Sequence, residues 1–328
     1  MTAGDPLGHD ISVADELARR GITGSRNTRA VAAIGRLLGD AVDVLRAPFA
    51  GHEAGKGDEA AAMAAAALQS MAPGERKRLA PILAAHYREM LTKHENKRAV
   101  VAHAVEELKR IAPEADGARG ADGPMSDDWL NFFAAYAEKA ASEKLRQTFG
   151  HVLSGEIRRP GAFSVFTLRI VSELDAESAG LFQRIAARAF SMDATSAVPS
   201  TVLKPEGLRG PFLHQMLKLE ALGLIQEVGG DFSISTSTAE PGAQIWARFG
   251  PLLLRGELKT KVHFTLPLLK LTDAGAELCA IIPMDHHGGA RDVGGLMARR
   301  GLAASIHVIT GVANGDVHYR RQGEAVKA

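Results

Sequence analysis

The sequence predicts a mainly α-helical protein with a smaller α+β part, and three observations carry this prediction. Apolar residues recur at helical spacing over most of the first half of the chain, as Val31, Ile34 and Leu38 do. Aromatic residues make up only 5% of the chain while alanine is abundant, which favours helical cores built from aliphatic side chains. Later stretches such as Asp231–Ser237 alternate between polar and apolar residues, as strands do.

Breaks in this pattern divide the chain into five segments. A Pro/Gly/Asp-rich stretch marks the clearest boundary, because such residues favour turns and linkers over helices. The segments are a flexible N-terminus (1–25), a helical arm (26–112), a linker (113–125), a compact helical domain (126–192) and a winged-helix-like α+β domain with a terminal β-hairpin (200–328).

The arm contains two prominent predicted helices. An alanine-dense helix is expected to end at Pro73-Gly74, since proline and glycine disfavour helix interiors. Glu75–Ile111 then predicts a long helix whose apolar stripe weakens between His94 and Arg98. A helix of this length either folds back in a hairpin or pairs with another chain as a coiled coil. Self-association through the N-terminal helices is therefore one predicted partnership.

The segment from residue 126 to 192 has sharply marked helix boundaries. Ser126 is a predicted N-cap, because its hydroxyl can accept a bond from the first helical amides. Pro160 ends a second helix that starts after Ser142, and Asp175 is expected to cap another helix. The predicted core residues of this segment are Trp129, Phe133, Phe149, Phe163 and Leu168.

The last segment has the element order of many winged-helix domains. A helix over Pro211–Leu222 ends at Gly223 and is followed by strands and a short helix capped at Thr272. The glycine-rich stretch DHHGGARDVGG, from Asp285 to Gly295, is expected to be mobile. The stretches ASIHVITG and GDVHYRR predict the closing β-hairpin.

Several rare elements in the middle of the chain occur in a fixed order. They are Asp128-Trp129-Leu130, Gly155-Glu156, Pro160-Gly161-x-Phe163-Ser164 and Thr167-Leu168. In this order they resemble a bacterial family catalogued as domain of unknown function 2806, which is similar in layout to the Abi-alpha proteins associated with abortive phage infection. The resemblance implies a role in phage defence or stress response, and it implies no catalytic residues.

Glu156 is the residue of this motif with the strongest potential for chemistry. A buried glutamate with a raised pKa can act as a general base. The alternative is a carboxylate that pairs with Arg158 or Arg159 and steadies the helix end. We favour the structural alternative, because neither a nucleophile nor a metal-ligand set accompanies Glu156 in the sequence.

The sequence predicts no metal and no cofactor. His86, His94 and His103 lie eight and nine residues apart, too far along one helix to face a single ion. Asp285, His286 and His287 are expected to form a solvated loop. The one cysteine, Cys279, excludes a disulfide framework within the chain and lies on a face that looks buried.

Basic residues of the last segment are the predicted nucleic-acid contacts. A net charge of +1 gives no general attraction to nucleic acid, so any basic surface must be local. The predicted recognition helix carries few base-reading side chains, whereas the predicted wing carries several cations. The predicted contacts are His214, Lys218, Arg255, Lys259, Lys261, Arg320 and Arg321.

These patterns together predict a non-enzymatic, cytoplasmic interaction or sensor protein, with a protein partner or nucleic acid held by the last segment. The cytoplasmic assignment rests on the lack of a secretory signal, of a spanning apolar run and of paired cysteines. The main alternative is a winged-helix DNA-binding regulator. A weaker alternative is a peripheral membrane-associated effector that uses the amphipathic helix after Thr28.

Overall fold

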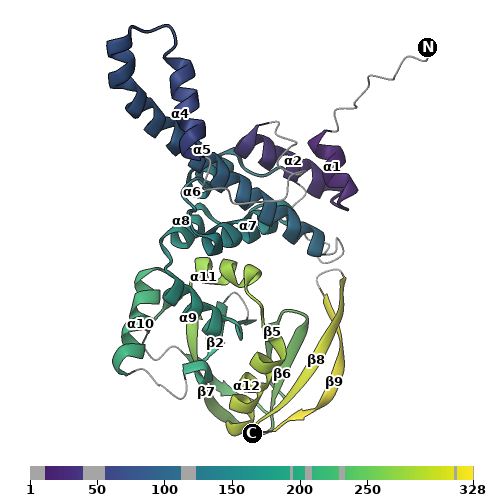
Figure 1. Ribbon diagram of the computed structural model, residues 1–328. Coiled ribbons are helices and arrows are strands. Elements are labelled where there is room, and N and C mark those ends of the chain that lie inside the picture. Colours follow the sequence, from purple (N-terminus) through teal and green to yellow (C-terminus); the bar gives the residue numbers. More distant parts are fainter. Residues whose placement is uncertain are drawn as a thin grey trace, which may run out of the picture. The chain divides into compact units, whose positions relative to one another are not determined.

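The computed structural model describes residues 12–39, 56–111, 123–192, 195–203, 209–228, 233–313 and 316–327. The chain divides into two compact units, Met1–Ser172 and Glu173–Ala328. Unit 1 is helical, whereas unit 2 combines helices with one antiparallel sheet, which confirms a mainly α protein with a smaller α+β part (Figure 1). The boundary between the units falls inside the range 126–192 that the sequence predicts as one domain.

Unit 1 is built from seven helices within its described residues. They are α1 (Val13–Arg19), α2 (Gly24–Leu38), α4 (Lys56–Ala67), α5 (Pro73–Arg110), α6 (Asp127–Ala137), α7 (Glu143–Arg158) and α8 (Val165–Glu173).

Helices α4 and α5 form a hairpin (Figure 1). The long predicted helix does not itself fold back, because α5 runs unbroken from Pro73 to Arg110. The sequence prediction that Pro73-Gly74 ends the alanine-dense helix is wrong. Helix α4 ends at Ala67, and Pro73 instead opens α5. Proline suits the first turn of a helix, because that turn needs no amide donor and its backbone angle matches the one that proline fixes.

The predicted arm is not separate from the helices that follow it. The second half of α5 buries one face, which runs from Asn96 to Leu108, and packs against α7. Helix α2 buries Ala33, Ile34 and Leu37 and contacts α5, α6 and α7. Helix α4 and the first half of α5 extend beyond this shared core (Figure 1).

Side-chain caps fix several helix starts at the expected residues. Ser126 accepts a hydrogen bond from the Trp129 amide, and Ser142 accepts one from the Leu145 amide. Each cap supplies an acceptor to an amide that has no partner within its own helix. The two caps set the starts of α6 and α7 and thereby the phase at which their aromatic side chains face inward.

Unit 2 is a nine-stranded antiparallel sheet with helices α9 (Ala176–Ala186), α10 (Gly210–Ala221), α11 (Asp273–Leu278) and α12 (His286–Arg299) in its described residues. The strands are β1 (Phe190–Met192), β2 (Thr195–Pro199), β3 (Ile225–Gln226), β4 (Ser233–Ala239), β5 (Gln244–Phe249), β6 (Leu252–Leu258), β7 (Val262–Leu271), β8 (Leu302–Ala313) and β9 (Asp316–Val326). They follow the order β3-β7-β2-β1-β5-β6-β8-β9, and β4 also pairs with β7.

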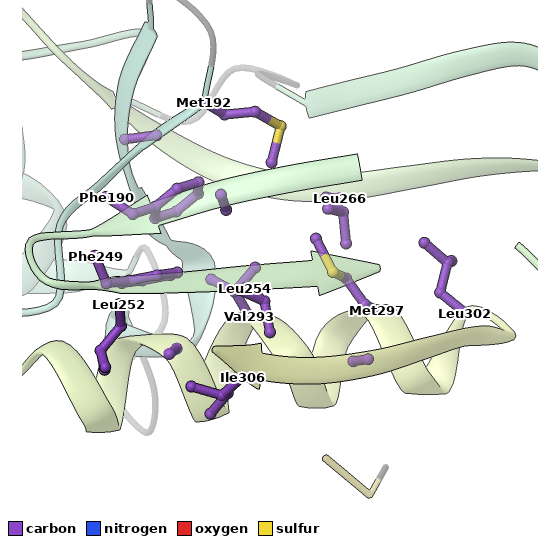
Figure 2. Close-up of a cluster of buried hydrophobic side chains, with 14 of the residues drawn as sticks. Phe190, Met192, Phe249, Leu252, Leu254, Leu266, Val293, Met297, Leu302 and Ile306 are labelled. Atoms are coloured by element: carbon purple, nitrogen blue, oxygen red, sulfur yellow. The ribbon is translucent and has the colours of Figure 1, made fainter. Parts of the chain in front are cut away.

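The core of unit 2 lies between this sheet and α12 (Figure 2). Val293 and Met297 of the helix are fully buried among inward-facing strand residues such as Phe249, Leu254 and Ile306. Strand β6 shows the underlying pattern, because its side chains alternate between buried and partly exposed along its whole length. The packing of α12 on one face leaves the alternate residues of β5, β6 and β8 pointing to the other.

The prediction that Asp285–Gly295 is mobile is wrong, because this stretch forms the N-cap and most of α12. Asp285 caps the helix by accepting a bond from the Gly288 amide. A Cβ atom at Gly289 would lie 3.0 Å from the ring of Phe249, so the glycine allows close packing of the helix on the sheet. The glycines that suggest flexibility in the sequence allow α12 to pack closely in the fold.

Candidate functional site

The five predicted core residues of the middle segment are all buried in unit 1. Trp129 is 5% exposed, and Phe133, Phe149, Phe163 and Leu168 are each at most 1% exposed. Trp129 stacks on Phe133 with ring centroids 4.9 Å apart, and Phe133 meets Phe149 edge to face at 5.7 Å. The indole N–H of Trp129 donates to the Phe163 carbonyl over 2.7 Å, so the polar atom of this ring is also paired.

Glu156 lies in the same buried region and holds the turn that follows α7. Its carboxylate accepts hydrogen bonds from the amides of Gly161 (2.6 Å) and Phe163 (3.1 Å). The residue is 2% exposed. A Cβ atom at Gly155 would lie 2.6 Å from the Phe163 ring, which explains the glycine beside the glutamate. Glu156 therefore fastens a turn and is not presented to solvent as a catalytic base would be.

The other groups weighed for chemistry are not assembled into a reactive site in the part of the chain that the structure describes. No three His, Cys, Asp or Glu residues of those ranges are grouped so that they could hold a metal ion. Desolvation raises the pKa of the Cys279 thiol to about 12, so this thiol is protonated and unreactive at neutral pH. Asp285 bonds to Arg188 and caps α12 rather than joining His286 and His287 around an ion.

The predicted nucleic-acid contacts fall in three separate places within unit 2. His214 and Lys218 lie on α10, where Lys218 forms an ion pair with Asp175. Lys259 and Lys261 lie in the turn between β6 and β7, where Lys261 pairs with Glu240 over 2.6 Å. The remaining three, Arg255, Arg320 and Arg321, lie on strands β6 and β9.

Strand register separates the last three arginines into two sets. Arg321 pairs with His307 of β8, and Arg255 pairs with Ser305, two residues away on the same strand. Residues two apart share a face of a sheet, so Arg255 and Arg321 lie together on the face opposite α12. Arg320 pairs with Val308, which packs toward the α12 side, so Arg320 lies on the other face.

Aromatic side chains join the two arginines on this open face. Trp246 lies 6.1 Å from the His307 ring and 5.3 Å from the Tyr319 ring, and His307 meets Tyr319 edge to face at 4.9 Å. The Arg255 guanidinium lies 5.8 Å from the centre of the Trp246 ring. Arg248 shares the face, because it lies two residues after Trp246 on β5. We call these six residues the sheet-face cluster: Trp246, Arg248, Arg255, His307, Tyr319 and Arg321.

His307 is the buried centre of the sheet-face cluster. It is 6% exposed, and its Nε2 lies 2.9 Å from the Ser305 hydroxyl. Among the described residues, neither its Nδ1 nor the Nε of Arg255 has a hydrogen-bond partner. Burial lowers the pKa of His307, and the charges of Arg255 and Arg321 lower it further, so the ring is neutral at pH 7. Buried polar atoms without partners are rare in folded proteins.

Four members of this cluster are not among the sequence-predicted site residues: Trp246, Arg248, His307 and Tyr319. They lie on three strands, and one of these strands, β5, was not predicted from the sequence at all. The available signal is the period of two in Gln244–Phe249, which places Trp246 and Arg248 on one face. No signal in the sequence alone brings that face next to His307 and Tyr319.

The described elements thus define a chain of two units, one helical around a buried aromatic motif and one built on a nine-stranded antiparallel sheet. The chain belongs to the family described as "Protein of unknown function (DUF2806)", whose model matches residues 86–288, more than half of the chain. The match includes Trp129, Glu156 and Trp246 and ends before β8 and β9. Comparison of the chain with curated proteins and with solved structures finds no match.

A bilayer-spanning helix is not found in the ranges that the structure describes, because none of their helices is both long and apolar enough. The amphipathic helix weighed for membrane contact, α2, instead turns Ala33, Ile34 and Leu37 into the core of unit 1. These side chains are engaged by α5, α6 and α7 and are not offered to a lipid surface.

Proposed function

We propose that this chain is a non-enzymatic binding protein that holds an anionic partner on the sheet-face cluster of unit 2. The arrangement of Arg248, Arg255 and Arg321 around partly exposed rings carries this proposal. Arg248 and Arg321 are exposed, and Arg255 is half-buried beside Trp246. Arginine combines planar hydrogen-bond donors with a permanent charge, which suits it to carboxylate and phosphate ligands.

Among the described residues of this face, the cationic charge exceeds what the acidic neighbour Glu257 neutralises. Arg255 forms an ion pair with Glu257 over 2.7 Å, and both side chains are partly exposed. The Nε of Arg255 stays without a partner among the described residues, and Arg321 contributes a second exposed cation next to His307. A local cationic surface of this kind attracts anions even though the chain carries a net charge of only +1.

The non-enzymatic part of the proposal is supported by the geometry of Glu156. Backbone amides of the following turn bind its carboxylate, and Phe163 covers Gly155 beside it. A general base needs an oxygen within reach of a substrate proton. Here the carboxylate orders the protein's own backbone, which favours a structural role for the motif that marks the family.

A winged-helix regulator that reads duplex DNA through α10 is the second candidate. One observation favours it: β7 lies between β2 and β3, so α9, β2, α10, β3 and β7 follow the order of a winged-helix core. The polar side chains of α10 argue against it. Lys218 pairs with Asp175, and Gln215 donates to Glu177. A recognition helix needs such groups free for base edges, so the sheet face is the better-supported surface.

The wider roles are part of the same proposal. Phage defence or stress response follows from the family resemblance alone, as the cytoplasmic location follows from the sequence. Self-association is supported by the hairpin of α4 and α5, where Met63, Ile82 and Met90 are exposed apolar side chains. Exposed apolar groups close together favour a protein contact. Sedimentation velocity of the full chain over a range of concentrations measures whether such a contact forms.

Two adjacent arginines provide a matched test of the anion site. Arg321 lies on the cluster face and Arg320 on the opposite face, while both are exposed on β9. We expect Arg321→Glu to weaken binding of fluorescein-labelled heparin oligosaccharide or labelled single-stranded DNA at least about tenfold, because a cation that would bond to the anion is replaced by a repelling carboxylate. Arg320→Glu should change the Kd by less than about twofold. Fluorescence anisotropy at low and moderate salt measures both.

Two results would contradict the anion site. One is the absence of binding by any anionic probe at micromolar protein and low salt. The other is an equal loss of affinity in the two variants, because general electrostatic attraction does not distinguish the faces of a sheet. A loss confined to Arg321→Glu, with steep salt dependence, supports the proposal.

A further inference from the structure

We propose that the anionic partner is a single-stranded nucleic acid, with bases stacked against Trp246 and Tyr319 and phosphates bound by Arg248 and Arg321. This inference rests on the proposed function, because it names the ligand class of the same face. Two features of the sheet-face cluster support it: the exposure of its rings and the spacing of its arginines.

The Trp246 and Tyr319 rings are tilted by 56° to each other, so each ring can take the face of a separate base. Tyr319 is 42% exposed and Trp246 is half-buried, while the two rings shield His307 between them. Every nucleic-acid base has a flat apolar face, so stacking on such rings stabilises binding without requiring a particular sequence. A carboxylate-rich peptide has no such flat group and gains nothing from the rings beyond their contact with Arg255.

The arginines lie at both ends of one row of the sheet. The register places Arg248, Leu253, His307 and Arg321 in line across β5, β6, β8 and β9. Three interstrand steps of about 4.8 Å separate the outer two backbones by roughly 14 Å. A flexible strand that crosses the sheet along this row meets a phosphate-binding side chain on either side of the rings.

The accessible groups of a single strand suit this face better than those of a duplex. A base in a single strand exposes its pairing edge, which carries both donors and acceptors. A duplex keeps that edge and the base faces inside and offers only groove edges and backbone. The cluster therefore fits a single strand better than a double helix.

The experiment uses the full chain and a 5′-labelled oligothymidylate of about 15 nucleotides, within the range of single-strand site sizes. The comparison ligands are an abasic deoxyribose-phosphate strand of equal length, an oligouridylate, a duplex and polyglutamate. We expect the abasic strand to bind about tenfold more weakly than the oligothymidylate, because it keeps the charge and loses the stacking. The oligouridylate arm shows whether RNA or DNA is preferred, since both carry the required bases.

Variants of the rings locate the effect. Trp246→Ala should lower the affinity for the oligothymidylate about tenfold and leave the affinity for the abasic strand unchanged, so that the two ligands become alike. Trp246→Phe should restore most of the difference. Circular dichroism verifies that each variant is folded, and the comparison of ligands on the unaltered chain needs no variant at all.

The possible outcomes separate this inference from the proposed function. If the abasic strand binds as tightly as the oligothymidylate and Arg321→Glu weakens both, the anion site stands and the stacking inference is overturned. Tighter binding of the duplex or of polyglutamate also overturns it. If none of the anions binds, the inference and the proposed function both fail.

Discussion

The two tryptophans of this chain both lie in aromatic clusters, but the two clusters differ in burial and in hydrogen bonding. Around Trp129, in unit 1, the rings are buried and the indole N–H is bonded to the Phe163 carbonyl. Around Trp246, in unit 2, one ring is exposed and an imidazole nitrogen beneath it has no partner among the described residues. The polar atom of the Trp129 ring is hydrogen-bonded within the protein, whereas the Trp246 cluster leaves ring surface and arginine side chains accessible to a ligand.

The contrast separates the aromatic cluster that packs unit 1 from the cluster that carries a candidate function. The Trp129 cluster coincides with the residues that resemble the family, and its parts explain one another: Gly155 makes room for Phe163, and Glu156 orders the turn that positions it. The residues of this cluster thus describe how unit 1 packs. The arginines and unpaired nitrogen at Trp246 describe how unit 2 can bind, and this difference can be tested directly.

The largest expected effect is the loss of stability on truncating Trp129. Trp129→Ala removes a ring that is 5% exposed and leaves a cavity beside Phe133, so we expect a loss of about 3–5 kcal/mol in the free energy of unfolding. Trp246→Ala should cost far less, because its ring is only half-buried. Urea denaturation followed by circular dichroism measures both. Equal losses in the two variants would remove the distinction between the clusters.

The next effect comes from overpacking the same buried motif. Gly155→Ala places a Cβ atom 2.6 Å from the Phe163 ring, and we expect it to destabilise unit 1 by about 1–3 kcal/mol. Gly35→Ala is the matched control, since it lies in α2 with no atom within 4 Å of the added Cβ. That control should stabilise the protein by about 0.4–1 kcal/mol, because alanine restricts the unfolded chain. Thermal unfolding of both variants tests the pair, and a tolerated Gly155→Ala would show that the motif is loosely packed.

The smallest effect is a pH dependence that belongs to the open cluster. Burial, with the charges of Arg255 and Arg321, lowers the pKa of His307 from its ordinary value of 6.5. Because the folded pKa is the lower one, the neutral ring favours the folded state above pH 6.5, and this contribution is lost as the pH falls below that value. His307→Gln should therefore show a smaller fall in unfolding free energy between about pH 7.5 and pH 5.5 than the unaltered chain.

The pH comparison has its own internal check. His94 and His151 in unit 1 also have pKa values lowered by burial, so part of the decline persists in the variant. An unchanged decline in His307→Gln would mean that the ring is hydrated or already paired. Urea titrations at both pH values, analysed with the same slope, give the difference.

The sequence predicts the Trp129 cluster well because its interactions are local or periodic. Ser126 caps the helix that carries Trp129 and Phe133, and Glu156 reaches amides only five and seven residues ahead. Such spacings can be recognised along a single helix and the turn after it. The Gly155 contact follows from the same short range.

The sheet-face cluster could not be predicted in this way, because it depends on register between distant strands. Trp246 and Tyr319 meet only after β6 and β8 are placed between β5 and β9. A shift of one residue in any pairing would turn these side chains to the other face. The misreading of α12 has a related cause, since Gly289 and Gly294 are explained only by contacts to Phe249 and Val326.

The position of α12 has a practical consequence for anyone who trims the chain to its family match. Residue 288 lies in the first turn of that helix, so a protein ending there would lose Val293, Met297, Leu302 and Ile306. The apolar face of the sheet that α12 covers would then be exposed to water. Strand β6 would lose its partner β8 and become an edge strand that can pair with strands of other molecules. A protein truncated at this point should aggregate, because the last forty residues complete the core of unit 2.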